Sequence, residues 1–369
     1  MSDRTSPLHQ LHVDAGASFT DFAGWQMPVS YGSDLAEHHA VRTAAGIFDI
    51  SHMAEIMVTA VDAAAFLDYA LAGKISAVAI GQAKYSLLLN EQGGIIDDLV
   101  VYRFINDQFL VVANAGNREP VVSALQKRAA AFTVEVIDSS DDYALIAVQG
   151  PRSREILEET VGITELGKPL DELKYYWSTD AFFAGQPLLI GRTGYTGEDG
   201  FELYIATAHA AELWSALVAA GADKGLVPAG LASRDTLRLE AGMPLYGHEL
   251  GVDTFPVQAG LGRVVAMTKE GDFVGRAAVE AGPASNARVL VGLRAEGKRA
   301  GRAEYPVFDG EREVGVITSG ALSPTLGYPI AMAYVSPDVA EVGTSLTIDV
   351  RGSRVLASVV PLPFYKRES

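Results

Sequence analysis

The sequence predicts an α+β protein with two related α+β lobes and an all-β C-terminal domain. As far as about residue 250, amphipathic helical stretches alternate with short apolar runs, a pattern typical of packed helices and strands. From about residue 285 onward, short strands alternate with glycine and proline turns, which favours a small barrel. A length of 369 residues fits two or three domains.

Composition excludes several classes of function. The formal net charge of −17 repels nucleic acid and anionic membranes, so neither is an expected partner. The absence of cysteine excludes disulfides, thiolate metal ligands and a cysteine nucleophile. The N-terminal stretch MSDRTSPLHQLHVDAG is polar and lacks the apolar segment of a secretory signal, and no segment reaches the apolar length of a membrane helix. We therefore expect a cytoplasmic protein.

The first lobe is expected to open with an aromatic connection and a helix. Residues 22–32 (FAGWQMPVSYG) are rich in aromatic and turn-forming residues, and we expect a packed connection there rather than a helix or strand. Residues 34–43 have helical spacing, and Gly46 is expected to end that helix before the next strand. The adjacent His38 and His39 would point roughly 100° apart on this helix, so a shared metal ion is not expected.

An inserted lobe is predicted over residues 54–137. Its strands and helices follow an order that resembles the β-α-β-β-α-β of a ferredoxin-like unit. Within it, Gly93-Gly94 marks a turn between two apolar runs, which predicts a β-hairpin. The predicted strands are 54–58, 84–89, 99–101, 108–113 and 132–136, and the predicted helices are 63–71 and 119–130.

Asp97 and Asp98 stand at the mouth of the second hairpin strand. Because a strand points successive side chains to opposite faces, only one of the two is expected to face inward. An inward carboxylate on an apolar strand costs free energy unless something pairs with it. This makes the pair the first functional candidate, and the alternative is a pair of solvated turn residues.

The lobe that encloses this insertion continues after it. The glycine-rich stretch 192–203 (RTGYTGEDGFEL) places Glu202 between two apolar neighbours, so strand alternation puts its side chain on the face opposite to theirs. Glu198 and Asp199 in the same stretch are expected to be solvated turn residues. Strands are predicted over 144–149 and within 177–190, and helices over 153–161, 208–220 and 229–240.

The C-terminal domain is predicted from its strands alone. These strands are 289–293, 313–318, 330–335, 345–350 and 354–359. The chain thus divides into a discontinuous first lobe (1–53 and 138–250), the inserted lobe (54–137), a connecting segment (251–284) and a barrel domain (285–369).

Common catalytic and nucleotide-binding motifs do not explain the chain. No G-x-G-x-x-G follows a strand and opens a helix, and neither a P-loop nor a G-x-S-x-G elbow occurs. The remaining candidates are carboxylates, arginines and aromatic residues. A carboxylate suits an aminopyrimidine-like edge, and an arginine suits a carboxylate or carbonyl. A planar polar ligand is therefore favoured.

Five stretches in order along the chain resemble one family, the T-proteins of the glycine cleavage system. They are the run from FAGWQMPVSYG through EHHAVR to GIFDISHM, then NEQGGIIDDLVVY, GYTGEDGFE, RDTLRLEAGMPLYG and TSGALSPTLGYPIAMAYV. The resemblance implies a three-lobed cloverleaf. Two ferredoxin-like lobes and a β-barrel would surround a central cavity for tetrahydrofolate.

The resemblance also implies an aminomethyltransferase. In this family, a lipoylated H-protein presents the aminomethyl group that glycine decarboxylase leaves on its lipoyl sulfur. The one-carbon unit passes to tetrahydrofolate, and ammonia, 5,10-methylenetetrahydrofolate and the reduced lipoyl arm are released. Tetrahydrofolate would be the acceptor substrate, the partner would supply the lipoyl group, and no metal is implied.

The same resemblance implies the site residues. Asp97 matches the family's key carboxylate near folate N10, with a role in orienting the folate and assisting proton movement. Glu202 matches the glutamate at the pterin edge. Arg234 and Tyr365 match substrate-binding residues, and for Arg234 both the pterin carbonyl and the glutamyl tail are open alternatives. Further expected cavity-lining residues are Met53, Tyr85, Asn114, Tyr195 and Met243, with core packing as the alternative for the tyrosines and methionines.

One position departs from the family. The chain has Arg263 where the family often has tryptophan, and stacking on a ring and pairing with a carboxylate are both open alternatives for it. Two alternatives to the activity also stay open. The first is another folate-dependent one-carbon transferase or demethylase of the same fold, and the second is a non-catalytic folate-binding module.

Overall fold

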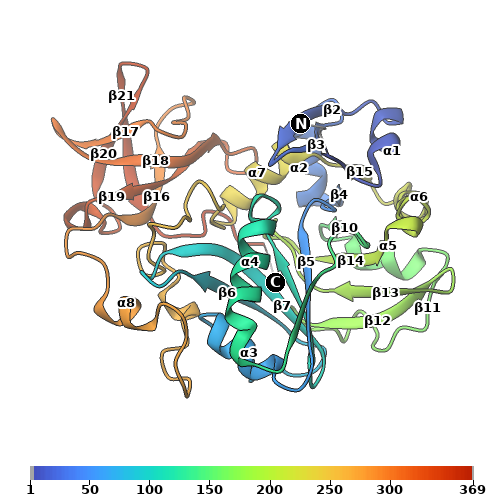
Figure 1. Cartoon of the computed structure of the whole chain (residues 1–369). Helices are drawn as coiled ribbons and strands as arrows, with labels where there is room; N and C mark the ends of the chain where they lie inside the picture. Colours follow the sequence, from blue (N-terminus) through green and yellow to red (C-terminus); the bar gives the residue numbers. More distant parts are fainter. Residues whose placement is uncertain (1–3, 368–369) are drawn as a thin grey trace. The chain divides into compact units, whose positions relative to one another are not determined.

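Three sheets and a closed barrel make up the structure (Figure 1). It is a computed structural model and describes residues 4–367. Its contacts divide the chain into two units. The first is Met1–Asp68, Lys74–Tyr85 and Leu99–Arg234, and the second is Tyr69–Gly73, Ser86–Asp98 and Asp235–Ser369. The mixed α and β structure with a C-terminal barrel confirms the coarse fold prediction.

The finer domain boundaries stay a prediction. The first three and last two residues of the predicted domain ranges, 1–3 and 368–369, lie outside the described residues. Among residues 4–367, every helix falls short of the length or the apolar character that a membrane crossing requires.

A small sheet lies at the start of the first unit. Its strands are β1 (Arg4–Thr5), β2 (Ser18–Phe22) and β3 (Trp25–Ser30), with helix α1 (His9–Asp14) between the first two. The strand order is β1-β3-β2, so the prediction of an irregular connection over 22–32 is wrong. Pro28 is tolerated in the central strand because β1 pairs only with Trp25 and Gln26, and Pro28 itself lies beside a register shift opposite β2.

Helix α2 (Asp34–Thr43) has the predicted bounds. The side chain of Ser33 caps its N-terminus by accepting a backbone N–H at 3.2 Å. The helix gives way to strand β4 (Ala45–Asp49), so the prediction that Gly46 ends the helix is wrong. Gly46 is part of the strand because it pairs with Gln149 across a ladder.

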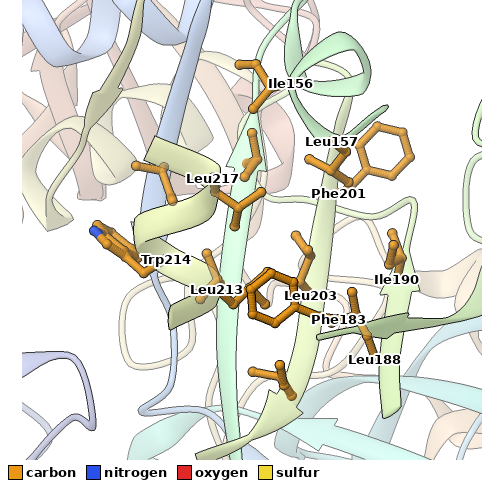
Figure 2. Packing of buried hydrophobic residues seen from close by; sticks show 14 of the residues in the cluster. Ile156, Leu157, Phe183, Leu188, Ile190, Phe201, Leu203, Leu213, Trp214 and Leu217 are labelled. Carbon is orange, nitrogen blue, oxygen red and sulfur yellow. The ribbon is translucent and has the colours of Figure 1, made fainter. Parts of the chain in front are cut away.

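A seven-stranded sheet forms the core of the first unit, in the order β11-β12-β13-β14-β10-β4-β15. Helices α5 and α6 pack against one face of this sheet through a shared apolar cluster. Figure 2 shows Leu213 and Leu217 of α6 in the same apolar cluster as Phe201 and Leu203 of β14. The other elements are β10 (Tyr143–Gln149), α5 (Ser153–Glu159), β11 (Ile163–Thr164), β12 (Ser178–Phe183), β13 (Gln186–Gly191), β14 (Gly200–Ala206), α6 (Ala210–Gly221) and β15 (Leu226–Pro228).

Strand β14 has one apolar face and one polar face. Phe201 and Leu203 are fully buried in the cluster under the helices. Glu202 and Tyr204 therefore point to the opposite face, as the alternation of the sequence predicts. In the ladder, Glu202 lies directly across from Gly191 of β13.

A five-stranded sheet in the order β6-β7-β8-β5-β9 forms the inserted segment. Its elements are β5 (Ala54–Thr59), α3 (Ala63–Ala70), β6 (Ala83–Leu89), β7 (Ile95–Ile105), β8 (Gln108–Ala113), α4 (Arg118–Arg128) and β9 (Glu135–Asp138). The predicted hairpin around Gly93-Gly94 is confirmed. The predicted strands and helices are present. Their order is β-α-β-β-β-α-β, so the comparison with the β-α-β-β-α-β order of a ferredoxin-like unit is wrong.

Six strands close a barrel in the order β16-β19-β18-β17-β20-β21. They are β16 (Val289–Ala295), β17 (Pro306–Asp309), β18 (Arg312–Leu322), β19 (Pro329–Val335), β20 (Ser345–Val350) and β21 (Ser353–Val360). The five predicted strands are confirmed. Strand β17 was not predicted, because it has four residues, begins with proline and meets β18 at an irregular register. Helices α7 (Leu231–Glu240) and α8 (Arg276–Ala281) precede the barrel.

The turn between β6 and β7 is fixed by hydrogen bonds to a later loop of the second unit. Asn90 closes the turn by accepting the Gly94 N–H at 2.8 Å, and it donates to the carbonyl of Val252 at 2.9 Å. The N–H of Ile95 donates to the carbonyl of Gly251 at 3.1 Å. A Cβ atom on Gly94 would lie 1.7 Å from the Val252 carbonyl oxygen, so this contact requires glycine.

We expect Gly94→Ala to lower the free energy of unfolding by about 3 kcal/mol or more, because a backbone carbonyl cannot move away without breaking the turn. Gly251→Ala is the matched control in the same contact, since no atom lies within 4 Å of its Cβ position. Urea unfolding of both variants measures the difference, and equal midpoints would contradict the expectation.

Candidate functional site

The first unit brings Glu202 and Arg234 together without an ion pair between them. Glu202 projects from the polar face of β14, and Arg234 lies in the first turns of α7. Burial raises the pKa of the Glu202 carboxyl, and the Arg234 guanidinium opposes that rise. Nη1 of Arg234 is buried and has no hydrogen-bond partner. A buried donor left without an acceptor costs about 1–3 kcal/mol, so this position favours a ligand that supplies one.

Two rings stand close to the Arg234 guanidinium. Its Cζ lies over the ring of Tyr195 at 5.1 Å from the centroid, a cation–π arrangement. His52 is buried, and burial together with the Arg234 charge lowers its pKa to about 4. The imidazole is therefore neutral at physiological pH, and its buried Nδ1 has no hydrogen-bond partner. Burial lowers the pKa of the Arg234 guanidinium, and the charge of Glu202 opposes that change. Arg234 thus faces uncharged groups on these two sides.

Glu202 is held by one hydrogen bond from the neighbouring loop. The hydroxyl of Thr193 donates to Oε2 of Glu202 at 2.6 Å. The hydroxyl of Tyr102 lies 2.8 Å from that of Thr193, and the hydroxyl of Tyr204 donates to that of Tyr102 at 3.3 Å. Oε1 of Glu202 receives no hydrogen bond from the described part of the chain. One oxygen is thus anchored while the other is available to a ligand.

The second unit holds Asp97. Its side chain is fully buried on β7, whereas Asp98 is half-buried, so the expectation that one of the two faces inward is confirmed. Tyr246 lies near both carboxylates. Burial raises the pKa of Tyr246, and the negative charges of the two aspartates raise it further. Tyr246 therefore stays a neutral hydroxyl beside Asp97.

Met243 and Tyr365 lie at the end of α7 in the same unit. Arg238 organises this region: it is 1% exposed, forms an ion pair with Glu249 at 3.0 Å and donates to the Met243 carbonyl at 3.2 Å. The N–H of Tyr365 donates to the carbonyl of Glu240 at 2.8 Å. The loop that carries Met243 and the C-terminal segment that carries Tyr365 are therefore both tied to this helix.

Three expected lining residues lie in the first unit. Met53 is half-buried just before β5, and Tyr85 is half-buried in β6. Asn114 follows β8 and accepts the N–H of Asn117 at 2.9 Å through its backbone carbonyl. Their assignment to a site stays a prediction.

Glu198 is not the solvated turn residue that the sequence predicts. It is buried and forms an ion pair with Arg42 at 2.9 Å. Its neighbour Asp199 pairs with Arg192 through both carboxylate oxygens, at 2.9 and 2.6 Å. The tertiary fold supplies an arginine to each carboxylate from α2 and from the loop after β13, and local turn chemistry gives no signal for these partners.

Several residues of the site have no motif that identifies them. His52, Tyr102 and Thr193 are single polar or aromatic residues beside apolar strands, a pattern that predicts core packing. Arg263 is exposed in a short 3-10 turn. Within residues 4–367, no group of three His, Cys, Asp or Glu side chains is arranged to hold a metal ion.

Comparisons with known proteins cover nearly the whole chain. Residues 8–269 match the family model described as the GCVT N-terminal domain, and residues 288–366 match the glycine cleavage T-protein C-terminal barrel domain. The chain is 58% identical to an aminomethyltransferase of Cutibacterium acnes and 52% identical to one of Saccharopolyspora erythraea, with at least 99% of each protein covered. It is also similar to the crystal structure of glycine cleavage system aminomethyltransferase T from Bartonella henselae, with a TM-score of 0.90, 39% identity and 99% of both chains covered.

Glu55 is another buried carboxyl in the first unit. It is fully buried on β5, and neither of its oxygens has a hydrogen-bond partner. Burial raises its pKa well above the usual range, although Arg118 opposes the rise. The guanidinium of Arg118 is itself engaged by Asp138 and Asp141, each at 2.7 Å. Burial thus favours the neutral, protonated form of Glu55 in the folded protein.

We expect Glu55→Gln to be more stable than the natural chain at pH 8 and about equally stable near pH 5. The folded state retains a proton that the unfolded chain releases above its own pKa, so the stability of the natural protein falls as pH rises through that window. The amide of the variant cannot ionise, which removes this dependence. Urea midpoints across pH measure it, with Glu135→Gln, at an exposed residue of β9 in the same sheet, as control. Parallel pH profiles for Glu55→Gln and the natural chain would contradict the assignment.

Proposed function

The chain belongs to the glycine cleavage T-protein family and is an aminomethyltransferase of the glycine cleavage system, and from this we propose its substrates and the roles of its residues. The donor is the S-aminomethyl-dihydrolipoyl arm of the lipoylated H-protein. The acceptor is tetrahydrofolate. The products are ammonia, 5,10-methylenetetrahydrofolate and the reduced lipoyl arm.

The reaction moves one carbon and two protons. The carbon leaves its bonds to the lipoyl sulfur and to the amino nitrogen, and forms bonds to N5 and N10 of tetrahydrofolate. The two folate N–H protons are lost, one ending on the departing ammonia and the other on the lipoyl thiol. The protein must therefore hold the pterin and offer a base near the folate nitrogens.

The observation that supports folate binding is the separation of Glu202 from Arg234. The Glu202 carboxylate suits the amino group and N–H of a pterin edge, through parallel charge-assisted hydrogen bonds to Oε1 and to the remaining lone pair of Oε2. The buried, unpartnered Nη1 of Arg234 suits an anionic or carbonyl oxygen. A ligand with an amino edge and a carbonyl in one ring satisfies both groups, which assigns the pterin carbonyl to Arg234 rather than the glutamyl tail.

We assign the base to Asp97. Its carboxylate is buried on a strand whose preceding turn is fixed by backbone hydrogen bonds, so its position is set before substrate binds. The neutral hydroxyl of Tyr246 nearby can donate a hydrogen bond without competing for the proton. In this role Asp97 accepts the proton that N10 loses as the methylene bridge closes.

The finer fold prediction belongs to the same proposal. Three lobes would surround one folate cavity, and the residues that the family motifs indicate would line that cavity. These are Asp97, Glu202, Arg234, Tyr365, Met53, Tyr85, Asn114, Tyr195 and Met243. A structure with bound reduced folate tests this arrangement directly.

We expect Asp97→Asn to retain the fold and to lower the rate of transfer by about a hundredfold or more, because the amide cannot accept the N10 proton. Asp98→Asn, at the adjacent half-buried residue, is the matched control and should have a much smaller effect. The assay is single-turnover formation of 5,10-methylenetetrahydrofolate from aminomethylated H-protein. A rate for Asp97→Asn within a few-fold of the natural rate would refute the role of Asp97, and folate binding without any product would favour a non-catalytic module.

For Glu202→Gln and for Arg234→Met, we expect the KM for tetrahydrofolate to rise by about tenfold to a hundredfold, the range for hydrogen bonds to charged groups. The KM for aminomethylated H-protein should change little, because these residues are assigned to the pterin. Glu212→Gln, at an exposed residue in the first turn of α6, is the control. An unchanged KM for tetrahydrofolate in both variants would contradict the pterin assignment.

A further inference from the structure

A buried chain of hydroxyl groups leads from the protein core to Glu202. It begins at Tyr204, two residues from Glu202 on the same face of β14, and passes through Tyr102 of β7 to Thr193. Thr193 completes the chain at Oε2 of Glu202. The chain thus leaves β14 and returns to it two residues away, and all of its members belong to the first unit.

Because the Glu202 carboxylate accepts a hydrogen bond, every hydroxyl in this series must donate in the direction of Glu202. Thr193 has a single hydroxyl proton, which it donates to the carboxylate at 2.6 Å. The hydroxyl of Tyr102 must then donate to Thr193, at 2.8 Å, and that of Tyr204 donates to Tyr102, at 3.3 Å. All three protons point toward Glu202. Each bond polarises the next, so the chain stabilises negative charge on the carboxylate more than Thr193 would alone.

Both tyrosines are suited to donate permanently. Burial raises the pKa of Tyr102, and the charge of Glu202 raises it further. Burial also raises the pKa of Tyr204 well above its usual range, with Tyr102 and Glu202 adding to the rise. Neither phenol ionises under working conditions. The two hydroxyls therefore remain donors whatever the pH of the assay.

Close packing fixes Tyr102 beside its partners. Tyr102 is fully buried, and a Cβ atom on Gly191 would lie 2.7 Å from its hydroxyl oxygen. Gly191 is the residue directly across the ladder from Glu202. The missing side chain at this position leaves room for the tyrosine hydroxyl next to the carboxylate strand. The glycine at this position of the sheet thus leaves the space that the Tyr102 hydroxyl occupies.

We propose that Tyr102 and Tyr204 are positioning residues for the reaction: acting through Thr193, their hydroxyls hold Glu202 ionised and oriented toward the pterin edge of tetrahydrofolate. This inference rests on the proposed function of Glu202. Neither tyrosine touches the substrate in this role. They act on the affinity for folate through the carboxylate that they support.

The groups around the carboxylate define the expected pH response. Arg234 of α7 faces Glu202 and favours its ionised form. Outside the hydroxyl chain, the charge of Glu55 raises the pKa of Tyr204, and the charge of Tyr176 raises the pKa of Tyr102. Because the hydroxyl chain stabilises the ionised carboxyl against burial, its removal shifts ionisation of Glu202 to higher pH.

The test compares Tyr102→Phe and Tyr204→Phe with the natural chain. We expect the KM for tetrahydrofolate to rise by about three- to tenfold in Tyr102→Phe and by less in Tyr204→Phe, with kcat nearly unchanged. As pH falls from about 8 to 5, folate binding should weaken at a higher pH in Tyr102→Phe than in the natural chain. Tyr143→Phe, at an exposed residue that begins β10, is the control.

A pair of variants at Thr193 keeps the test independent of changes in core packing. Thr193→Val should raise the KM for tetrahydrofolate at least as much as Tyr102→Phe, and Thr193→Ser, which keeps the hydroxyl, should recover most of that loss. If Tyr102→Phe folds, retains the natural KM and retains the natural pH profile, the proposal is overturned. The same holds if Thr193→Ser binds folate as weakly as Thr193→Val.

Glu202→Gln separates this proposal from the proposed function. If Glu202→Gln weakens folate binding while the Tyr102 and Thr193 variants do not, the positioning role alone fails. If Glu202→Gln has no effect on folate binding, the assignment of the pterin site fails first.

Discussion

The candidate site of the first unit depends on one constraint. A guanidinium and a carboxylate lie near each other but do not form an ion pair. Arg234 is held by α7 and the ring of Tyr195, and Glu202 is held by β14 and the hydroxyl of Thr193. Each is partly desolvated, and the fold supplies Arg234 Nη1 with no acceptor. A desolvated polar group left in this state costs free energy, and a ligand that satisfies it recovers that cost. In the proposed pterin site, this incomplete internal pairing is what a polar ring would complete.

Strand β14 contributes both to the apolar core of this unit and to its candidate site. Phe201 and Leu203 of β14 fill the apolar cluster beneath α5 and α6, while Glu202 and Tyr204 face the hydroxyl chain. A slip of one residue in the register would exchange the two faces. Packing of the apolar face therefore fixes where the carboxylate points, and the site requires no separate scaffold.

The second unit positions its carboxylate by a different means. Asp97 lies three residues after Gly94, whose contact with the Val252 carbonyl leaves no space for a side chain. Hydrogen bonds from Asn90 and Ile95 to the same loop fix the turn on both sides. Rigid backbone at the start of β7 thus helps to set the position of the proposed base before substrate binds.

Local periodicity in the sequence determined much of the secondary structure and part of the site. The bounds of α2 and β8 follow directly from it. Strand alternation alone indicated that only one of Asp97 and Asp98 faces inward and that Glu202 opposes its apolar neighbours. Periodicity is a property of adjacent residues, so it fails where proline and a register shift interrupt a strand, as in β3 and β17.

The partners of these residues were decided only by the tertiary structure. Tyr102 and Thr193 are 91 positions apart in the chain, and Arg42 and Glu198 are 156 apart, so no local pattern links them. His52 is a lone histidine in the sequence, and only the fold places it beside Arg234 and removes its charge. The sequence determined which faces of the strands carry polar groups. Sheet pairing determined which of those groups meet, because hydrogen bonds and desolvation depend on distances in space rather than on separation along the chain.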